Sequence, residues 1–213
     1  IKWAKEKEDA VFLGMGDYFD LGSASERRLL HSADLHESTS DTLDELYKAQ
    51  AEEFINKICF MKGRIAGLIE GNHYAVLKSG ITTTQYMCEV LGCKYLGVAG
   101  FVRLKFAIDT MRTAIDIFAH HGKGASRLIG GSLNRVQQLA EVAHADIYLM
   151  GHDHKRSAGV QSRMYLDSQC TVKEQRQLFA RTGSFLKAYK DGKVSYIADM
   201  ALPASDLGAI TIC

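Results

Sequence analysis

The sequence is poor in several features that define whole classes of protein. It contains one proline and no proline-rich or low-complexity linker, so we expect one domain over residues 1–213. No apolar run is long enough to cross a bilayer and no signal-peptide pattern is visible, so no membrane partner is expected. The formal net charge is only +1 at pH 7, which excludes a global field that attracts nucleic acid.

Cysteine is also sparse and irregularly spaced. The count of five is odd, and no Cys-x-x-Cys pair occurs. We interpret the cysteines as reduced thiols that pack as small apolar groups. This interpretation favours a reducing, cytoplasmic location.

The chain does contain a regular order of apolar runs and helical patterns. Strands are expected at residues 11–15, 64–69, 95–99, 101–108, 113–119, 146–150, 162–166, 177–185 and 194–197. Helices are expected at residues 42–61, 82–91 and 133–142, the first with Thr42 and Glu45 as a capping box and Asp41 as a competing cap. This order predicts an α/β (α+β) fold, a four-layer αββα sandwich with two mixed β-sheets flanked by helices.

Polar fragments follow four of the apolar runs. They are Gly16-Asp17-Tyr18-Phe19-Asp20, Gly71-Asn72-His73, His120-His121-Gly122 and Gly151-His152-Asp153-His154. Because the carboxyl ends of neighbouring strands meet at one edge of a sheet, we expect these fragments to converge. They offer a carboxylate, an amide oxygen and several imidazoles, a mixture that favours a pair of divalent metals over a cysteine-based zinc site.

In their order, these fragments resemble motifs of the calcineurin-like metallophosphoesterases. That family carries D-x-H, GD-x-x-D, GNH, a lone His after a strand, and GHxH, and the last four lie here between residues 16 and 154. The stretch that begins at Arg181 is similar to phage-type members. The resemblance implies hydrolysis of a phosphomonoester or phosphodiester by a hydroxide that two divalent metals activate, with manganese or iron preferred and zinc next. A DNA nuclease of the same family and a non-catalytic metal-binding scaffold remain as alternatives.

The resemblance also implies a role for each residue. Asp17 matches the carboxylate that bridges both metals, and Asn72 and His152 match ligands of the second metal. His154 matches a ligand of the first metal. His73 matches the catalytic histidine, which is not a ligand and acts near the leaving oxygen as proton donor or charge stabiliser.

Two further assignments are open at this point. We expect His121 to be the remaining ligand of the second metal because it directly precedes the loop glycine, while His120 alternates to the opposite side of the strand. A bulge would reverse that choice, so His120 stays as the alternative. Asp20 is expected to orient a ligand or to tie the loop.

The chain departs from the family pattern at its start. No D-x-H motif precedes Gly16, and the first residue is Ile1 and not Met. We therefore expect the first strand and its two ligands to lie upstream of residue 1, which leaves Asp17 and His154 for the first metal. The triplet Asp34-Leu35-His36 has the right letters, but it follows the second motif and lacks an apolar strand, so no ligand role is expected.

Basic residues near these motifs are weaker candidates. Gly122-Lys123-Gly124 lacks the Walker spacing and is rejected as a phosphate loop. Lys123 or Arg127 is a candidate contact of a substrate phosphate, with a solvated loop charge as the alternative. A set of three basic residues, interpreted either as a rim for nucleic acid or as strand-edge charges, comprises Lys155, Arg156 and Arg163.

Overall fold

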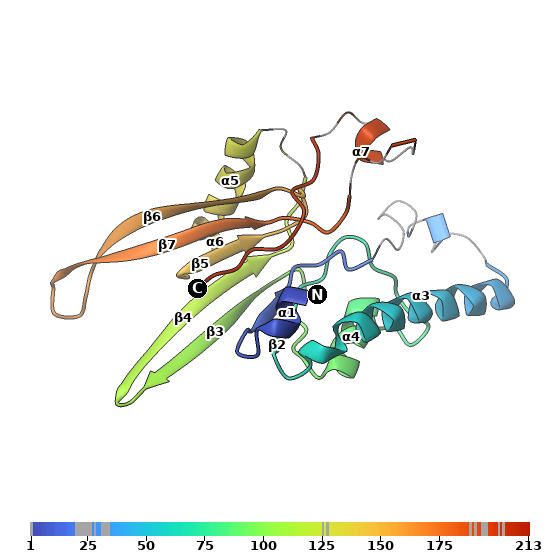
Figure 1. The fold of residues 1–213 in the computed structure, drawn as a ribbon, viewed down its shortest axis with the longest axis horizontal. Coiled ribbons are helices and arrows are strands. Elements are labelled where there is room, and N and C mark those ends of the chain that lie inside the picture. The colour runs from blue at the N-terminus through green and yellow to red at the C-terminus, as the bar shows by residue number, and fades with distance from the viewer. Residues whose placement is uncertain are drawn as a thin grey trace. The chain divides into compact units, whose positions relative to one another are not determined.

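The computed structural model describes residues 2–19, 27, 29–30, 35–124, 126, 128–187, 189, 191–192, 196–199, 201 and 203–213. The chain forms two compact units, Ile1–Ala99 and Gly100–Cys213 (Figure 1). One two-stranded parallel sheet and one five-stranded mixed sheet are present, together with helices. These elements confirm the predicted α+β class, while the stacking of the sheets in four layers stays a prediction.

The first unit combines a small parallel sheet with helices. Its elements are α1 (Lys2–Glu6), β1 (Phe12–Gly14), α3 (Glu37–Ile58), η1 (Cys59–Met61), β2 (Ile65–Leu68) and α4 (Thr83–Leu91). Strand β1 pairs with β2 in parallel. The core consists of Ala51, Ile55, Leu68, Met87, Cys88 and Leu91. The apolar sides of α3 and α4 thus bury strand β2, which leads to Gly71-Asn72-His73.

Local sequence signals set both ends of α4. Thr82 caps its first turn in a reciprocal capping box with Gln85, with a donor–acceptor distance of 3.1 Å for the Gln85 N–H and 2.7 Å for the Thr82 N–H. Gly92 ends the helix with a left-handed φ of 65°. The predicted helix at residues 82–91 is confirmed.

Helix α3 begins earlier than the sequence predicted, so the capping box at Thr42 is wrong. His36 is the N-cap, and its Nδ1 accepts a hydrogen bond from the Ser38 N–H at 3.3 Å. Thr42 lies inside the helix, where its hydroxyl donates to the Ser38 carbonyl at 2.9 Å. Asp41 forms an ion pair with Lys78 instead of capping. A distant residue thus engages the side chain that was expected to cap the first turn of the helix.

The second unit contains the mixed sheet. Its elements are β3 (Ala99–Ile108), β4 (Met111–His120), α5 (Ile129–Gln137), α6 (Leu139–Val142), β5 (Ile147–Met150), β6 (Arg156–Leu166), β7 (Val172–Thr182) and α7 (Tyr196–Asp199). The strand order is β3-β4-β5-β7-β6. Strand β5 is parallel to both neighbours, β4 and β7, while β6 and β7 form an antiparallel pair.

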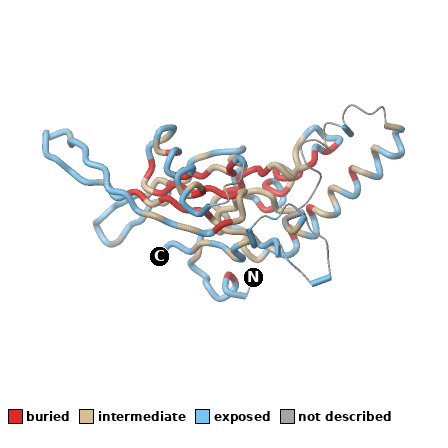
Figure 2. Tube along the Cα trace, turned by 90° about the horizontal axis from the view of Figure 1, so that it is seen from above, coloured by how far each residue is buried: buried red, intermediate tan, exposed pale blue. Residues whose placement is uncertain are grey.

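The core of the second unit lies along its central strands. Every residue of β5 is buried, and the buried residues of β4 and β7 lie toward their carboxyl ends. Tyr148 and Phe179 stack with ring centroids 4.9 Å apart, and Val136 and Leu139 pack on the same cluster. Figure 2 shows the buried segments in red and the exposed outer parts in pale blue. The carboxyl ends that carry the polar fragments are therefore anchored by the core.

The structure corrects the predicted bounds of three elements in this unit and the type of a fourth. Helix α5 begins at Ile129, ahead of the start predicted at residue 133. Strands β6 and β7 each have 11 residues, because they pair with each other beyond the apolar segments that predicted them. Residues 196–199 form α7, so the strand predicted at 194–197 is wrong over its described part; a short apolar run does not distinguish helix from strand.

Candidate metal centre

The predicted donor residues directly follow strands, as the sequence indicated. Strand β1 ends at Gly14 and β2 at Leu68, ahead of Asp17 and the Asn72 fragment. Strand β4 ends at His120 and β5 at Met150, ahead of the two histidine fragments. Each unit therefore has two such loops at strand carboxyl ends.

In the first unit, the loop after β1 meets the loop after β2. The Asp17 carboxylate oxygen Oδ1 accepts a hydrogen bond from the His73 N–H at 2.9 Å. Asp17 has a left-handed φ of 51°, a conformation that Asp tolerates better than most residues. The structure thus brings Asp17 together with the fragment of Asn72 and His73.

Tyr18 holds this pair of loops, a role that the sequence analysis missed. Its hydroxyl donates to the Ile69 carbonyl at 2.8 Å, and burial raises its pKa well above the usual value. Its ring lies 5.6 Å from that of Phe54. A Cβ on Gly14 would lie 2.5 Å from the hydroxyl, so the glycine before the loop leaves the space for it. Tyr18 therefore fixes the residue next to Asp17 against the strand that leads to Asn72.

In the second unit, His121 and His152 face each other. His152 Nδ1 lies 3.3 Å from His121 Nε2, and the rings are nearly perpendicular, at 80°. Metal–nitrogen bonds of about 2.0–2.1 Å at a tetrahedral angle place two ligand nitrogens about 3.3–3.4 Å apart. Both residues offer the nitrogen ligands that a divalent metal accepts. The separation of the two rings therefore fits shared coordination of one cation.

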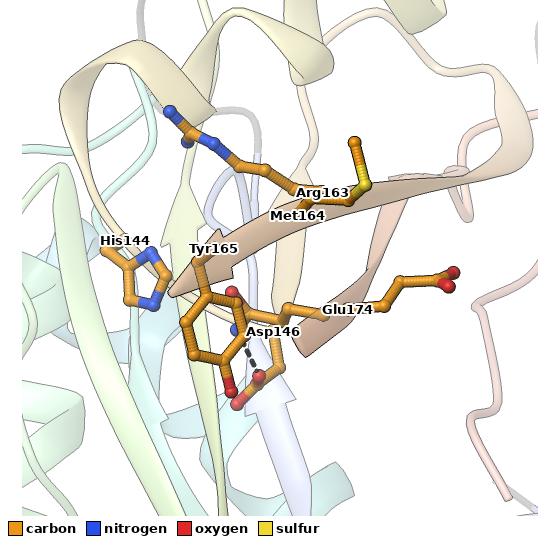
Figure 3. Close-up of a pocket in the computed structure, with 7 residues that line it drawn as sticks. His144, Asp146, Arg163, Met164, Tyr165 and Glu174 are labelled. Carbon is orange, nitrogen blue, oxygen red and sulfur yellow. Dashed lines mark hydrogen bonds between the residues drawn. The ribbon is translucent and has the colours of Figure 1, made fainter. Parts of the chain in front are cut away.

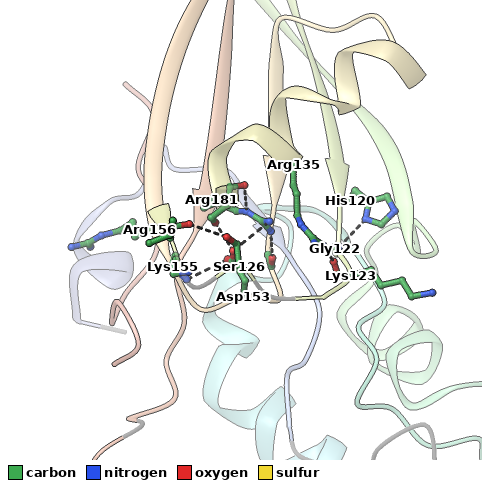
Figure 4. A network of polar contacts seen from close by, with 12 residues as sticks. His120, Gly122, Lys123, Ser126, Arg135, Asp153, Lys155, Arg156 and Arg181 are labelled. Carbon is green, nitrogen blue, oxygen red and sulfur yellow. Dashed lines mark hydrogen bonds and ion pairs between the residues drawn. The ribbon is translucent and has the colours of Figure 1, made fainter. Parts of the chain in front are cut away.

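His120 is oriented by the backbone and not toward His152. Its Nδ1 accepts a hydrogen bond from the Gly122 N–H at 2.7 Å, as Figure 4 shows. Burial, together with the positive charges of His121 and Arg181, lowers its pKa. A neutral ring whose Nδ1 is an acceptor fits this hydrogen bond. His121, and not His120, is therefore the ring that faces His152, and its role as a ligand stays a prediction.

The loop that carries His152 and His154 has an unusual backbone. Both histidines have left-handed φ angles, 74° and 58°. Gly122 approaches this loop so closely that a Cβ there would lie 2.9 Å from the Gly151 oxygen. The His154 carbonyl accepts a hydrogen bond from the Asp206 N–H at 2.9 Å. Between the histidines, Asp153 turns into the protein and pairs with buried Arg181, a contact that the sequence analysis did not predict.

Several predicted residues lie elsewhere or beyond the described part of the chain. Asp20, Asp34 and Arg127 lie outside the described residues. His36 caps α3. Lys155 is only 7% exposed, so its assignment to an exposed basic rim is wrong. It lies directly before β6 and is buried, whereas Arg156, the first residue of that strand, is exposed.

Arg163 lies in a separate pocket of the second unit (Figure 3). The pocket is lined by His144, Asp146, Arg163, Met164, Tyr165, Glu174 and Gln175. The Gln175 side-chain amide donates to Asp146 Oδ1 at 2.6 Å, and the Asp116 N–H donates to Asp146 Oδ2 at 2.9 Å. Asp146 is therefore engaged in joining neighbouring strands.

No family model, curated protein or solved structure matches the chain. Among the helices in the described part of the chain, none has the length and apolarity that a membrane crossing requires.

Proposed function

We propose that this chain is a metal-dependent phosphoesterase of the calcineurin-like metallophosphoesterase type, acting on a phosphomonoester or phosphodiester. The observation that carries the proposal is the pair formed by His121 Nε2 and His152 Nδ1, 3.3 Å apart. These nitrogens belong to loops after two parallel strands, where α/β proteins place their sites.

The proposal assigns the donor residues to two divalent cations, with manganese or iron preferred and zinc next. Asn72, His121 and His152 would hold one cation. His154 would hold the other, and the Asp17 carboxylate would be shared between them. When bound, such cations activate water and offset the negative charge of phosphoryl oxygens. The mixture of carboxylate, amide and imidazole is the support for this assignment.

The side chain of His73 would act on the leaving group. Its backbone N–H holds the Asp17 carboxylate at 2.9 Å, so residue 73 is tied directly to the proposed bridging ligand. In this role, the imidazole would donate a proton to the leaving oxygen or stabilise its charge. The backbone N–H of His73 would thus hold the ligand Asp17 in place, while its imidazole would take part in the reaction.

We place the protein in the cytoplasm. All five cysteines are free thiols, which suits a reducing compartment. Cys88 is buried in the core of the first unit, and burial with its neighbour Cys93 raises its pKa to about 12. A thiol of this kind serves packing and resists reaction.

Hydrolysis of chromogenic phosphates by the manganese-loaded chain tests the proposal. We expect turnover of a bis-aryl or a mono-aryl phosphate, and its loss in His121→Ala, with Arg103→Lys on the same sheet as a control. Manganese binding without turnover of either compound would overturn the proposal in favour of a scaffold. Degradation of single- or double-stranded DNA by the same preparation would identify the substrate as nucleic acid.

A further inference from the structure

A buried arginine connects the loop of His152 and His154 with the helix packed beside it. Arg181 lies on β7 and is fully buried. Its Nη1 donates to the Gly151 carbonyl at 2.6 Å, and its Nε donates to the Ser132 carbonyl at 3.0 Å. Its Nη2 lies 3.3 Å from Asp153 Oδ2. Figure 4 shows Arg181 beside Asp153. One planar side chain thus joins α5, the end of β5 and the loop.

The carboxylate of Asp153 has further partners of its own. Its side chain is 1% exposed, and it accepts a hydrogen bond from the Ser132 hydroxyl. The Lys155 N–H donates to its other oxygen at 3.4 Å. Asp153 is therefore held from three directions, although both of its chain neighbours have a left-handed backbone. Left-handed φ angles at two histidines are energetically unfavourable and persist only where the surroundings enforce them.

A buried ion pair is a poor source of stability, because its desolvation offsets most of the attraction between the charges. Apolar side chains of similar volume would fill the same space at comparable stability. Here the pair has two properties that apolar side chains lack. The planar guanidinium of Arg181 presents its donors in a fixed arrangement, and the pair contacts both ends of the loop, at the Gly151 carbonyl and the Lys155 N–H. These properties bear on the geometry of the loop.

We propose that Arg181 and Asp153 are positioning residues that hold His152 in the orientation in which it faces His121. This inference rests on the proposed function, because the orientation of His152 matters for a cation site only if the two histidines bind a cation. The ring arrangement itself exists without a metal and is measurable without one.

The charges of the cluster show which variants are informative. Lys155 is buried, and its ammonium group has no hydrogen-bond partner among the described residues. Removal of the Asp153 charge would leave the buried guanidinium of Arg181 without its carboxylate partner. Arg181→Lys keeps the charge but cannot make the three contacts of the fork, so it isolates geometry from charge.

Three variants form the test. Arg181→Lys removes the fork, and Ser132→Ala is a milder variant that removes one contact to Asp153. Gln177→Leu is the matched control, because Gln177 is a buried polar residue on the same strand that contacts Tyr148 and not the loop. The measurements are the thermal midpoint, the affinity for Co²⁺ with its absorption spectrum, and proton NMR contacts between the two imidazole rings in metal-free protein.

We expect Arg181→Lys to weaken Co²⁺ binding by about 10- to 100-fold, to change the Co²⁺ spectrum and to lose the contacts between the rings of His121 and His152. Ser132→Ala should produce the same changes to a smaller extent. Gln177→Leu should keep the ring contacts and bind Co²⁺ within about twofold of the parent, whatever its thermal midpoint.

Retention of the ring contacts in folded Arg181→Lys, or their equal loss in Gln177→Leu, would overturn the positioning role. If Arg181→Lys does not fold, the same two criteria apply to Ser132→Ala. Failure of the parent chain to bind any divalent cation would instead contradict the proposed function, and the ring contacts in metal-free protein would still decide the role of Arg181.

Discussion

Gly71 and Asp17 are in such close contact that no larger residue fits at position 71. A Cβ on Gly71 would lie 2.0 Å from Asp17 Oδ1 and 2.2 Å from the Asp17 nitrogen. The glycine of Gly71-Asn72-His73 is therefore required by the approach of a carboxylate from another loop. The motif that contains Asp17 and the motif that begins at Gly71 thus both depend on the close contact between these two residues.

Gly71→Ala should displace Asp17 and break the hydrogen bond from the His73 N–H. We expect the free energy of unfolding to fall by about 1–3 kcal/mol, as for other overpacked sites, and metal affinity to fall with it. Urea unfolding and calorimetric metal titration would measure both. Gly130→Ala is the control, because nothing lies within 4 Å of its added Cβ and alanine is a better helix former than glycine. Equal effects of the two variants would contradict the argument.

His73→Asn should separate chemistry from metal binding. The backbone N–H that holds Asp17 remains, so metal content should stay near that of the parent. Turnover should fall by about 10²- to 10⁴-fold, because the proton donor is lost. Metal analysis and steady-state kinetics on the same preparation check this expectation. An equal loss of metal would mean that His73 is a ligand.

Asp17→Asn should reduce metal binding at both proposed positions, since a neutral amide does not offset the repulsion between two cations. The amide oxygen can still accept the His73 N–H, so the fold should be retained. Stoichiometry from metal analysis and circular dichroism of the metal-free protein are the measurements. An unchanged number of bound ions would reject the bridging role.

His121→Ala and His120→Ala should differ in their effect on metal affinity. His121 Nε2 lies 3.3 Å from His152 Nδ1, while His120 Nδ1 accepts a hydrogen bond from the Gly122 N–H. We expect a loss of about 10-fold or more for His121→Ala and a much smaller loss for His120→Ala. Isothermal titration with Mn²⁺ or Zn²⁺ distinguishes them. The reverse order would indicate that the strand presents His120 to the cation.

Asp44→Ala should destabilise the first unit in a pH-dependent manner. Burial alone would raise the pKa of Asp44, but hydrogen bonds from Lys48 and from the Lys78 backbone outweigh it, so the pKa is lowered from 3.8. A lowered pKa means that the carboxylate stabilises the fold above the unfolded-state value and that this contribution is lost as pH falls through the folded-state value. We expect a loss of about 1 kcal/mol at pH 7 that shrinks below about pH 4. Urea unfolding of the parent and of Asp44→Ala across this pH range measures the loss, with Asp41→Ala as a comparison at an exposed carboxylate. A difference in the free energy of unfolding that stays constant with pH would contradict the role of the Asp44 charge.

Local patterns predicted the elements that depend on neighbouring residues. The boundaries of α4 follow from Thr82, Gln85 and Gly92, all of which act within one helical turn. The apolar runs before Asp17 and Asn72 likewise indicated β1 and β2. The start of α3 was predicted wrongly because the N-cap is His36, which is not a preferred N-cap residue, and because Asp41 pairs with the distant Lys78.

The sequence alone determined which polar residues follow strands, because strand ends are marked by short apolar runs and glycines. Which of these residues meet was decided by pairing between distant segments. His121 reaches His152 because β4 and β5 are parallel in the register that places His120 beside Met150. Arg181 reaches the same loop because β7 pairs with β5 at Met150. Burial of the Arg181–Asp153 pair is likewise a property of the assembled sheet and helix, since charged residues in a sequence give no local sign that they will be enclosed.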